Sequence, residues 1–221
     1  WHPVEFPVKT AEDVEVMCAF YEDITVEHDE EQDRAARERY AELGEDAVVT
    51  TGIGESPLME WVEWIAGIEN AHYLLADHAG KVEALFEEMH RVLLDKARIC
   101  AAHSVVDILY LIENTSTSLI SPSQYRKYCL PHITDYAGAA NAHGRDLFLH
   151  MCGFLKNLLP DLATLPVRGF EAFTSPPVAN TRLIDGRLAC PDKCIIGGTN
   201  AELWTHGADY IIAEIERDLD A

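Results

Sequence analysis

His150 and Cys152 are the residues whose types and spacing point most directly to chemistry. They close the apolar run 147–149, which is typical of a buried β-strand. Side chains two positions apart on a strand project to the same face, so an imidazole and a thiol would leave the strand end together. Such a pair supplies half of the ligands of a tetrahedral zinc site. The alternative is a hydrogen-bonded core histidine beside a small buried cysteine, which the pair alone slightly favours.

Further polar residues follow, or lie within, other strand-like segments. Glu113 and Asn114 come directly after the apolar run 105–112, and we expect a catalytic role for them in a pocket rather than a cap on the next helix. Glu171 lies inside the run 169–173, where a carboxylate needs a partner unless it belongs to an exposed strand face. The candidate substrate-binding residues are Glu55, Trp61 and Asn200, and packing in the core is the alternative for the tryptophan.

A strand–helix alternation from residue 47 onward must position these residues. Apolar and β-branched runs predict strands at 47–51, 105–112, 146–150, 169–173 and 194–198. Caps and helical periodicity predict helices at 10–21, 27–43, 79–101, 155–165, 181–188 and 210–219, and helices that begin near Ser56 and Ser121. Apolar strands that alternate with helices indicate a parallel sheet covered by helices.

Two architectures fit that alternation, a (β/α)8 barrel and an open doubly wound sheet. The segment 52–54 after the first strand lacks the third glycine of a dinucleotide-binding turn, which disfavours the open sheet. Polar residues follow strand after strand, as they do at the catalytic end of a barrel. We therefore predict an α/β fold, a (β/α)8 TIM barrel with about five of its eight strands present. Residues 1–46 are interpreted as a helical lead-in segment and residues 47–221 as the partial barrel domain.

The charge and composition exclude several classes of function. A net charge of −21 opposes binding to nucleic acid, and no basic cluster is visible that would hold an anion. The sequence contains no run of about 18 apolar residues, the length that would predict a membrane span, and we expect no membrane partner. The six cysteines are scattered, which favours a reduced, cytoplasmic protein over a disulfide scaffold. An open sheet exposes two edges, which a homodimer or further chain would cover.

Several motifs occur in an order that resembles the uroporphyrinogen decarboxylase superfamily. They are the segment 6–13 (FPVKTAED), the segment 120–125 (ISPSQY) with Leu130-Pro131, the segment 150–153 (HMCG) and the segment 196–198 (IGG). The family fold is a (β/α)8 barrel. In its zinc-dependent methyltransferase branch, a His-x-Cys pair at this strand end binds zinc together with another cysteine from a later strand. True decarboxylases lack the pair and use an Arg-rich N-terminal segment and an early aspartate, neither of which is present here.

The resemblance implies methyl transfer between a corrinoid and a thiol or folate acceptor through a zinc-activated thiolate. His150 and Cys152 would be zinc ligands, and within this chain Glu171 is a better substitute for the third than Cys190 or Cys194. The expected cofactors are Zn²⁺ and a corrinoid, and the expected partners are a small-molecule methyl acceptor and a corrinoid protein. Two alternatives stay open: metal-free uroporphyrinogen decarboxylation, and a non-catalytic barrel that binds a corrinoid or a partner.

Overall fold

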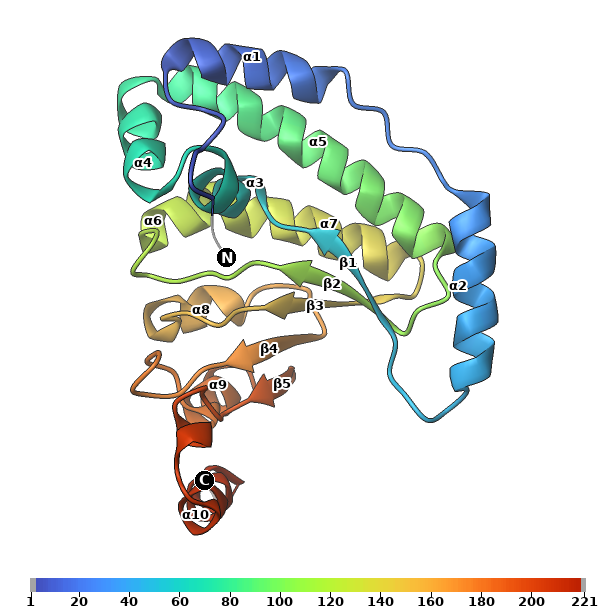
Figure 1. Cartoon of the computed structure of the whole chain (residues 1–221), viewed down its shortest axis with the longest axis vertical. Helices are drawn as coiled ribbons and strands as arrows, with labels where there is room; N and C mark the ends of the chain where they lie inside the picture. The colour runs from blue at the N-terminus through green and yellow to red at the C-terminus, as the bar shows by residue number, and fades with distance from the viewer. Residues whose placement is uncertain (1–2, 220–221) are drawn as a thin grey trace.

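The sheet has five parallel strands whose order in space is their order in the chain, β1-β2-β3-β4-β5. In the computed structural model, which describes residues 3–219, they are β1 (Thr50–Gly54), β2 (Ile108–Ile112), β3 (Asp146–His150), β4 (Gly169–Phe173) and β5 (Cys194–Gly197). A doubly wound sheet reverses its strand order at a switch point, whereas a barrel wall is strictly sequential. The predicted partial (β/α)8 barrel is therefore confirmed (Figure 1).

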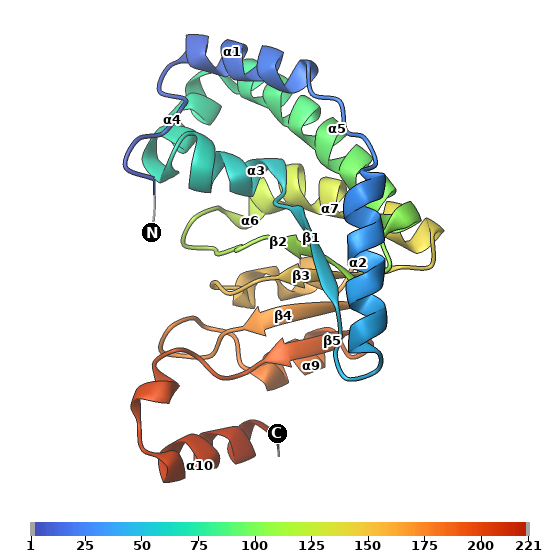
Figure 2. The ribbon, with the colours of Figure 1, turned by 45° about the vertical axis from the view of Figure 1, so that its right-hand side comes forward.

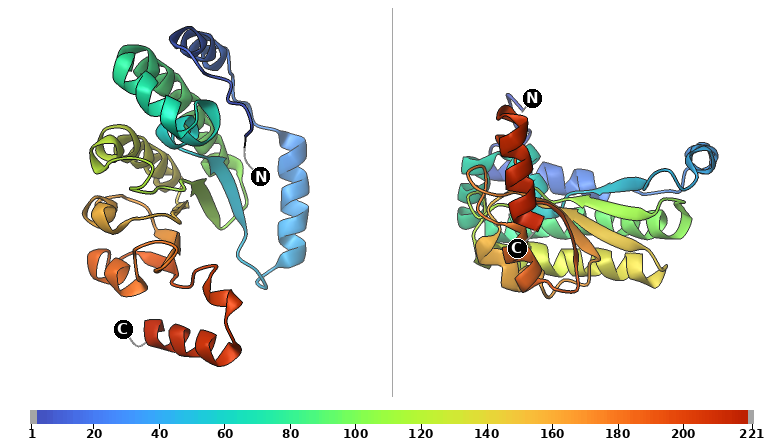
Figure 3. Two further views of the ribbon diagram at one scale, coloured as in Figure 1. Left: turned by 60° about the vertical axis from the view of Figure 1, so that its left-hand side comes forward. Right: turned by 90° about the horizontal axis from the view of Figure 1, so that it is seen from below.

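The helices that connect the strands stack along one side of the sheet (Figure 3, left). A long helix, α5, packs against α7, and α1 lies on the outside of α5. In Figure 2, α10 lies apart from the sheet, beyond β5. The helices are α1 (Ala11–Glu22), α2 (Glu30–Leu43), α3 (Pro57–Glu60), η1 (Trp61–Ile65), α4 (Ile68–Asp77), α5 (Ala79–His103), α6 (Pro122–Gln124), η2 (Tyr125–Cys129), α7 (Leu130–Ala142), η3 (Lys156–Leu158), α8 (Leu159–Leu162), α9 (Leu183–Ala189), η4 (Leu203–Thr205) and α10 (Ala208–Leu219).

The alternation of side chains in β2 separates the core from the interior face of the barrel wall. Leu109 and Leu111 are buried, toward the helices. Tyr110 lies between them in sequence and projects to the opposite face, because successive residues of a strand point to opposite sides. The parallel register then pairs Ile112 with His150, and His150 with Glu171. Polar side chains from neighbouring strands are thus brought together on the interior face.

The first strand begins later than the sequence predicts. Pairing with β2 starts at Thr50, opposite Ile108, and Val48 is 70% exposed. Just before the strand, the backbone N–H of Val49 donates to the carboxylate of Asp107 at 2.8 Å, so that the ladder begins after this contact. The run at 47–51 therefore includes both the segment that leads into β1 and the first residues of the strand.

The predicted helix that begins near Ser56 changes its winding after one turn. Residues Trp61–Ile65 form a π-helical turn, η1, and a second one, η2, interrupts the helix that begins near Ser121. Such wide turns are rare and are frequently found at functional sites. The first of them carries Glu63 and Trp64, which line a cavity described below.

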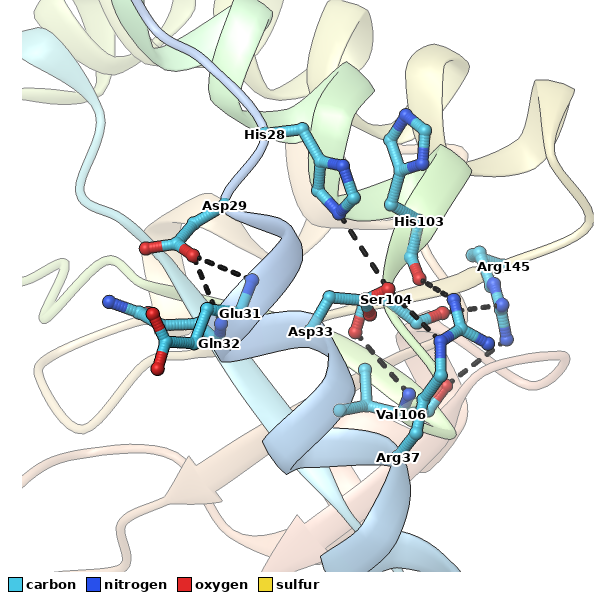
Figure 4. A network of polar contacts seen from close by, with 10 residues as sticks. All are labelled: His28, Asp29, Glu31, Gln32, Asp33, Arg37, His103, Ser104, Val106 and Arg145. Atoms are coloured by element: carbon cyan, nitrogen blue, oxygen red, sulfur yellow. Dashed lines mark hydrogen bonds and ion pairs between the residues drawn. The ribbon is translucent and has the colours of Figure 1, made fainter.

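The N-terminal segment is attached to the rest of the chain at both ends of the sheet. Near α4, the N–H of Val8 donates to the carbonyl oxygen of Ile65 at 3.1 Å. At the other end, Arg37 from α2 donates to the carbonyl oxygen of His103, and Arg145 holds the carbonyl oxygen of Ser104 (Figure 4). Within residues 3–219, no helix combines the length and apolar character that crossing a membrane requires.

Candidate functional site

His150, the last residue of β3, is held by two side chains from the neighbouring strands. Its Nδ1 atom lies 2.5 Å from Oε2 of Glu171 in β4 and 3.1 Å from the hydroxyl of Tyr110 in β2. The same hydroxyl donates to the Glu171 carboxylate. All three side chains share the interior face because of the strand register. With Nδ1 occupied in this way, Nε2 is the imidazole nitrogen left for a further partner.

The group is electrostatically coupled to Cys152. The pKa of His150 is raised to about 9, first by the neighbouring Cys152 side chain and further by the hydrogen bond to Glu171. Burial and the Glu171 carboxylate raise the pKa of Tyr110 above its usual range, so its hydroxyl stays a donor. The structure therefore places Glu171 in contact with His150, and Cys152 close enough to raise the pKa of His150, while their role as zinc ligands stays a prediction.

Cys152 is exposed and lies beside the end of β2. Its Sγ is 3.6 Å from Oδ1 of Asn114, whose Nδ2 donates to Oε2 of Glu63 at 3.1 Å. Asn114 has a φ of 46°, in the left-handed region that asparagine tolerates better than most residues. The backbone N–H groups of Glu113 and Asn114 both donate to the carbonyl oxygen of His150. This shared acceptor ties the ends of β2 and β3 together.

Glu113 lies behind the site. Its carboxylate is fully buried and accepts hydrogen bonds from the backbone N–H and the hydroxyl of Ser56, at 2.8 and 2.9 Å. Burial raises the pKa of Glu113 to about 7. The carboxylate thus joins the end of β2 to the start of α3, which is a positioning role; the catalytic role predicted for it would require contact with a ligand.

A cavity of about 560 Å³ opens beside Cys152 and Asn114 at the carboxyl ends of the strands. This is a usual size for a small-molecule site. Phe6, Glu63 and Trp64 form much of its wall. Glu55, predicted to bind substrate, lies just behind that wall: its two carboxylate oxygens accept the indole N–H of Trp64 at 3.0 and 3.2 Å. Burial raises the pKa of Glu55 to about 8, and Glu63 contributes.

Trp61 and Asn200 are not among the residues that line the cavity. The Trp61 ring is fully buried, donates to the carbonyl oxygen of Ala71 at 3.1 Å and packs on Phe86, so the substrate contact predicted for it is replaced by core packing. Asn200 is buried too, and its Nδ2 donates to the Ser175 hydroxyl, which joins the loops after β4 and β5.

Two residues of the site, Tyr110 and Glu63, escape sequence reasoning; for Trp64, as for Trp61, the sequence leaves both core packing and a place at the edge of a site open. Tyr110 could have been found, because it is two positions before Ile112 in β2 and therefore on the face that the His150 strand also presents. Glu63 and Trp64 depend on the π-helical turn, for which no local sequence signal is evident.

His150 and Cys152 are the types of ligand that zinc prefers, but they are one short of the three protein ligands of a catalytic zinc site. A histidine nitrogen and a cysteine sulfur are the ligands that zinc prefers, and catalytic sites use three protein ligands. Glu171, predicted as the third ligand, bonds instead to Nδ1 of His150, as carboxylates behind metal-bound histidines do. Among residues 3–219, no group of three or more His, Cys, Asp or Glu side chains is arranged to hold a metal ion.

Comparison with known proteins identifies the family. The model of the family named uroporphyrinogen decarboxylase (URO-D) matches residues 5–220. The chain belongs to the uroporphyrinogen decarboxylase family. Among solved structures, a methyltransferase from Methanosarcina mazei matches this family member with a TM-score of 0.67 and 16% identity, over 85% of this chain and 54% of that one. The chain thus spans about half the length of that structure, and the likeness extends to the fold. No curated protein matches the chain.

Proposed function

We propose that the protein is a methyltransferase of the uroporphyrinogen decarboxylase family, which moves a methyl group between a corrinoid and a thiol or folate acceptor. The observation that carries the proposal is the placement of His150 and Cys152 at the carboxyl edge of the sheet, beside a cavity. The fold similarity to a methyltransferase supports the same branch of the family.

The residues around the pair have distinct tasks in this proposal. Glu171 and Tyr110 hold the His150 ring through Nδ1 and leave Nε2 for zinc. Cys152 would be the second zinc ligand, and Asn114 lies beside its sulfur. Zinc bound there would keep an acceptor thiol in its reactive thiolate form at neutral pH. Phe6 and Trp64 give the cavity an aromatic wall beside Cys152.

Metal analysis of the purified full-length protein tests the proposal. We expect zinc in the wild type and its loss in Cys152→Ser. Cys194→Ser is the matched control, because Cys194 is also exposed but begins β5 at the opposite end of the sheet. Retention of zinc by Cys152→Ser would contradict the assignment of this ligand.

Uroporphyrinogen decarboxylation is the second candidate, favoured by the family membership itself. Its substrate carries many carboxylates and would need cationic side chains, yet among the described residues no Lys or Arg lines the cavity. Turnover of uroporphyrinogen by zinc-free protein would favour this candidate. A protein that contains no zinc and does not turn over uroporphyrinogen, but still binds a corrinoid protein, would be a non-catalytic barrel. The observation that motivates this alternative is the missing third zinc ligand among the described residues.

A further inference from the structure

The cavity beside Cys152 has a largely apolar wall. The N-terminal segment, η1, the start of α4 and the loop after β2 all contribute apolar or aromatic side chains to it. These side chains are Pro3, Phe6, Val62, Trp64, Ile68 and Leu119. A ligand that packs against such a wall is stabilised in proportion to the apolar area that both surfaces remove from water.

The polar side chains of Asn114 and Glu63, which also line the cavity, already have partners within the protein. Nδ2 of Asn114 donates to Oε2 of Glu63 at 3.1 Å, and Oδ1 of Asn114 accepts from the thiol of Cys152 at 3.6 Å. The other oxygen of Glu63, Oε1, is buried, so it cannot contact a ligand in the cavity. Burial also raises the pKa of Glu63, which favours the neutral form of its side chain.

Ser116 and Trp64 are occupied in the same way. Oγ of Ser116 accepts the backbone N–H of Phe154 at 3.1 Å and lies 2.7 Å from the hydroxyl of Ser118. The indole N–H of Trp64 donates to both carboxylate oxygens of Glu55. Among the lining residues that the structure describes, the sulfur of Cys152 is therefore the polar side-chain group best placed to meet a ligand.

A charged ligand would lose its hydration in this space without gaining a partner. No Lys or Arg side chain within residues 3–219 lines the cavity. His150, whose pKa is raised to about 9, is not among the lining residues either, and its Nδ1 is paired with Glu171. Burial of an unpaired charge of either sign is strongly unfavourable, whereas a neutral hydrocarbon group gains from the same contact.

We propose that the methyl acceptor of this site is a neutral thiol with a hydrocarbon body, whose sulfur lies beside Cys152 and whose body packs on Trp64 and Ile68. The inference rests on the proposed function, because it names the acceptor of that reaction. In the transfer, the S–H bond of the acceptor breaks and its proton passes to solvent. The sulfur then bonds to the methyl carbon as the carbon–cobalt bond breaks, and the electron pair of that bond stays with the corrinoid.

Calorimetric titration of the full-length protein tests this preference. The probes are 1-hexanethiol, the anion 4-mercaptobutyrate and the cation 5-aminopentanethiol, which are equal in their number of non-hydrogen atoms and carry the same primary thiol. Because the sulfur is common to all three, differences in affinity report the body of the ligand. We expect 1-hexanethiol to bind at least about tenfold more tightly than either charged thiol, and about tenfold more tightly than 1-butanethiol.

Three results of these titrations would each overturn the proposal. They are equal or tighter binding of a charged thiol, equal affinities of the two alkanethiols, and no binding of 1-hexanethiol.

Paired variants locate the binding. Ile68→Lys adds a cation to the apolar wall, so the ratio of the 1-hexanethiol affinity to the 4-mercaptobutyrate affinity should fall at least about tenfold. Ile212→Lys in α10 is the matched control, because Ile68 and Ile212 are both 53% exposed and Ile212 lies outside the cavity. Trp64→Ala should weaken 1-hexanethiol binding about fivefold, with the exposed Trp204→Ala as its control. Thermal unfolding establishes that each variant is folded. Unchanged binding in folded Ile68→Lys or Trp64→Ala contradicts the proposal.

The titrations use no corrinoid, so they fail independently of the proposed methyl transfer. The alcohols 1-hexanol and 1-butanol repeat the comparison of chain length without a thiol that could bind zinc, and 1-hexanol should bind more tightly. A zinc-free protein that prefers the neutral body would remove the proposed function and leave the preference of the cavity standing. Zinc that is lost in Cys152→Ser, together with tighter binding of 4-mercaptobutyrate, would leave the proposed function standing and remove this inference.

Discussion

The carboxylate of Glu171 lies 2.5 Å from Nδ1 of His150, although the two residues are 21 positions apart and on different strands. They are direct partners in the parallel register of β3 and β4. The carboxylate therefore fixes which imidazole nitrogen is free, and with it the direction in which His150 can bind.

Replacing Glu171 by glutamine should weaken zinc binding by about ten- to a hundredfold, because the His150 ring loses its charged partner. The affinity is measured by competition with a chelator. Glu202→Gln is the control, since Glu202 forms a similar carboxylate–histidine contact with His206 at the surface. An unchanged zinc affinity in Glu171→Gln would show that the carboxylate does not orient the ligand.

Glu113 should make the protein less stable as the pH rises. Its folded pKa of about 7 lies above the reference value of 4.5, so the folded state binds the proton more tightly, and stability falls as pH rises through this window. The expected loss is on the order of 2 kcal/mol. Glu113→Gln can accept from the Ser56 N–H with its amide oxygen and donate its amide N–H to the Ser56 hydroxyl oxygen, and it should flatten this dependence, measured by urea unfolding at pH 5 and pH 8. The exposed Glu38→Gln should retain the wild-type slope, and a slope unchanged in Glu113→Gln would contradict the prediction.

His132 should make the protein less stable as the pH falls. It is buried, stacks on His90 at 4.1 Å between ring centroids, and has a pKa lowered to about 4 by burial. A depressed histidine pKa favours the neutral folded state above pH 6.5, and this stability is lost as pH falls toward 4. Asp135 and Tyr136 are the other groups that contact the pair, both through His90.

His132→Phe keeps a stacked ring without a proton-binding site, and should therefore lose about 2 kcal/mol less than the wild type between pH 7 and pH 4. Denaturant unfolding at the two pH values measures the difference, with the exposed His143→Asn as the control. Equal acid sensitivity in His132→Phe and the wild type would rule out this histidine as the cause.

Gly153→Ala should destabilise the fold by about 1–3 kcal/mol. A methyl group there would lie 2.3 Å from Cβ of Ser116 and 2.4 Å from the carbonyl oxygen of Thr115, so the loops after β2 and β3 would have to separate. Gly138→Ala in α7 meets no atom within 4 Å and should be neutral or slightly stabilising. Chemical denaturation compares the two variants, and equal effects would refute the steric argument.

The fold was predictable because its signals are local and repeated. Strand–helix alternation predicted that the third strand ends at His150, whereas Cys152 lies beyond the strand, where the two-residue period does not apply. The features that the sequence did not predict depend on contacts with residues far away along the chain. The burial of Glu113 reflects its contacts with Ser56, 57 positions away, and the start of β1 depends on Asp107. Trp64 rather than Trp61 lines the cavity because both lie in a π-helical turn, which the usual helical period does not describe.

The hydrogen-bonded group of Tyr110, His150 and Glu171 draws on three consecutive strands, β2, β3 and β4, and on neither edge of the sheet. Its contacts span at most 61 positions of sequence, so its assembly requires only a few neighbouring strand–helix units to fold. The imidazole is thus oriented by contacts that β2, β3 and β4, the middle of the wall, make among themselves.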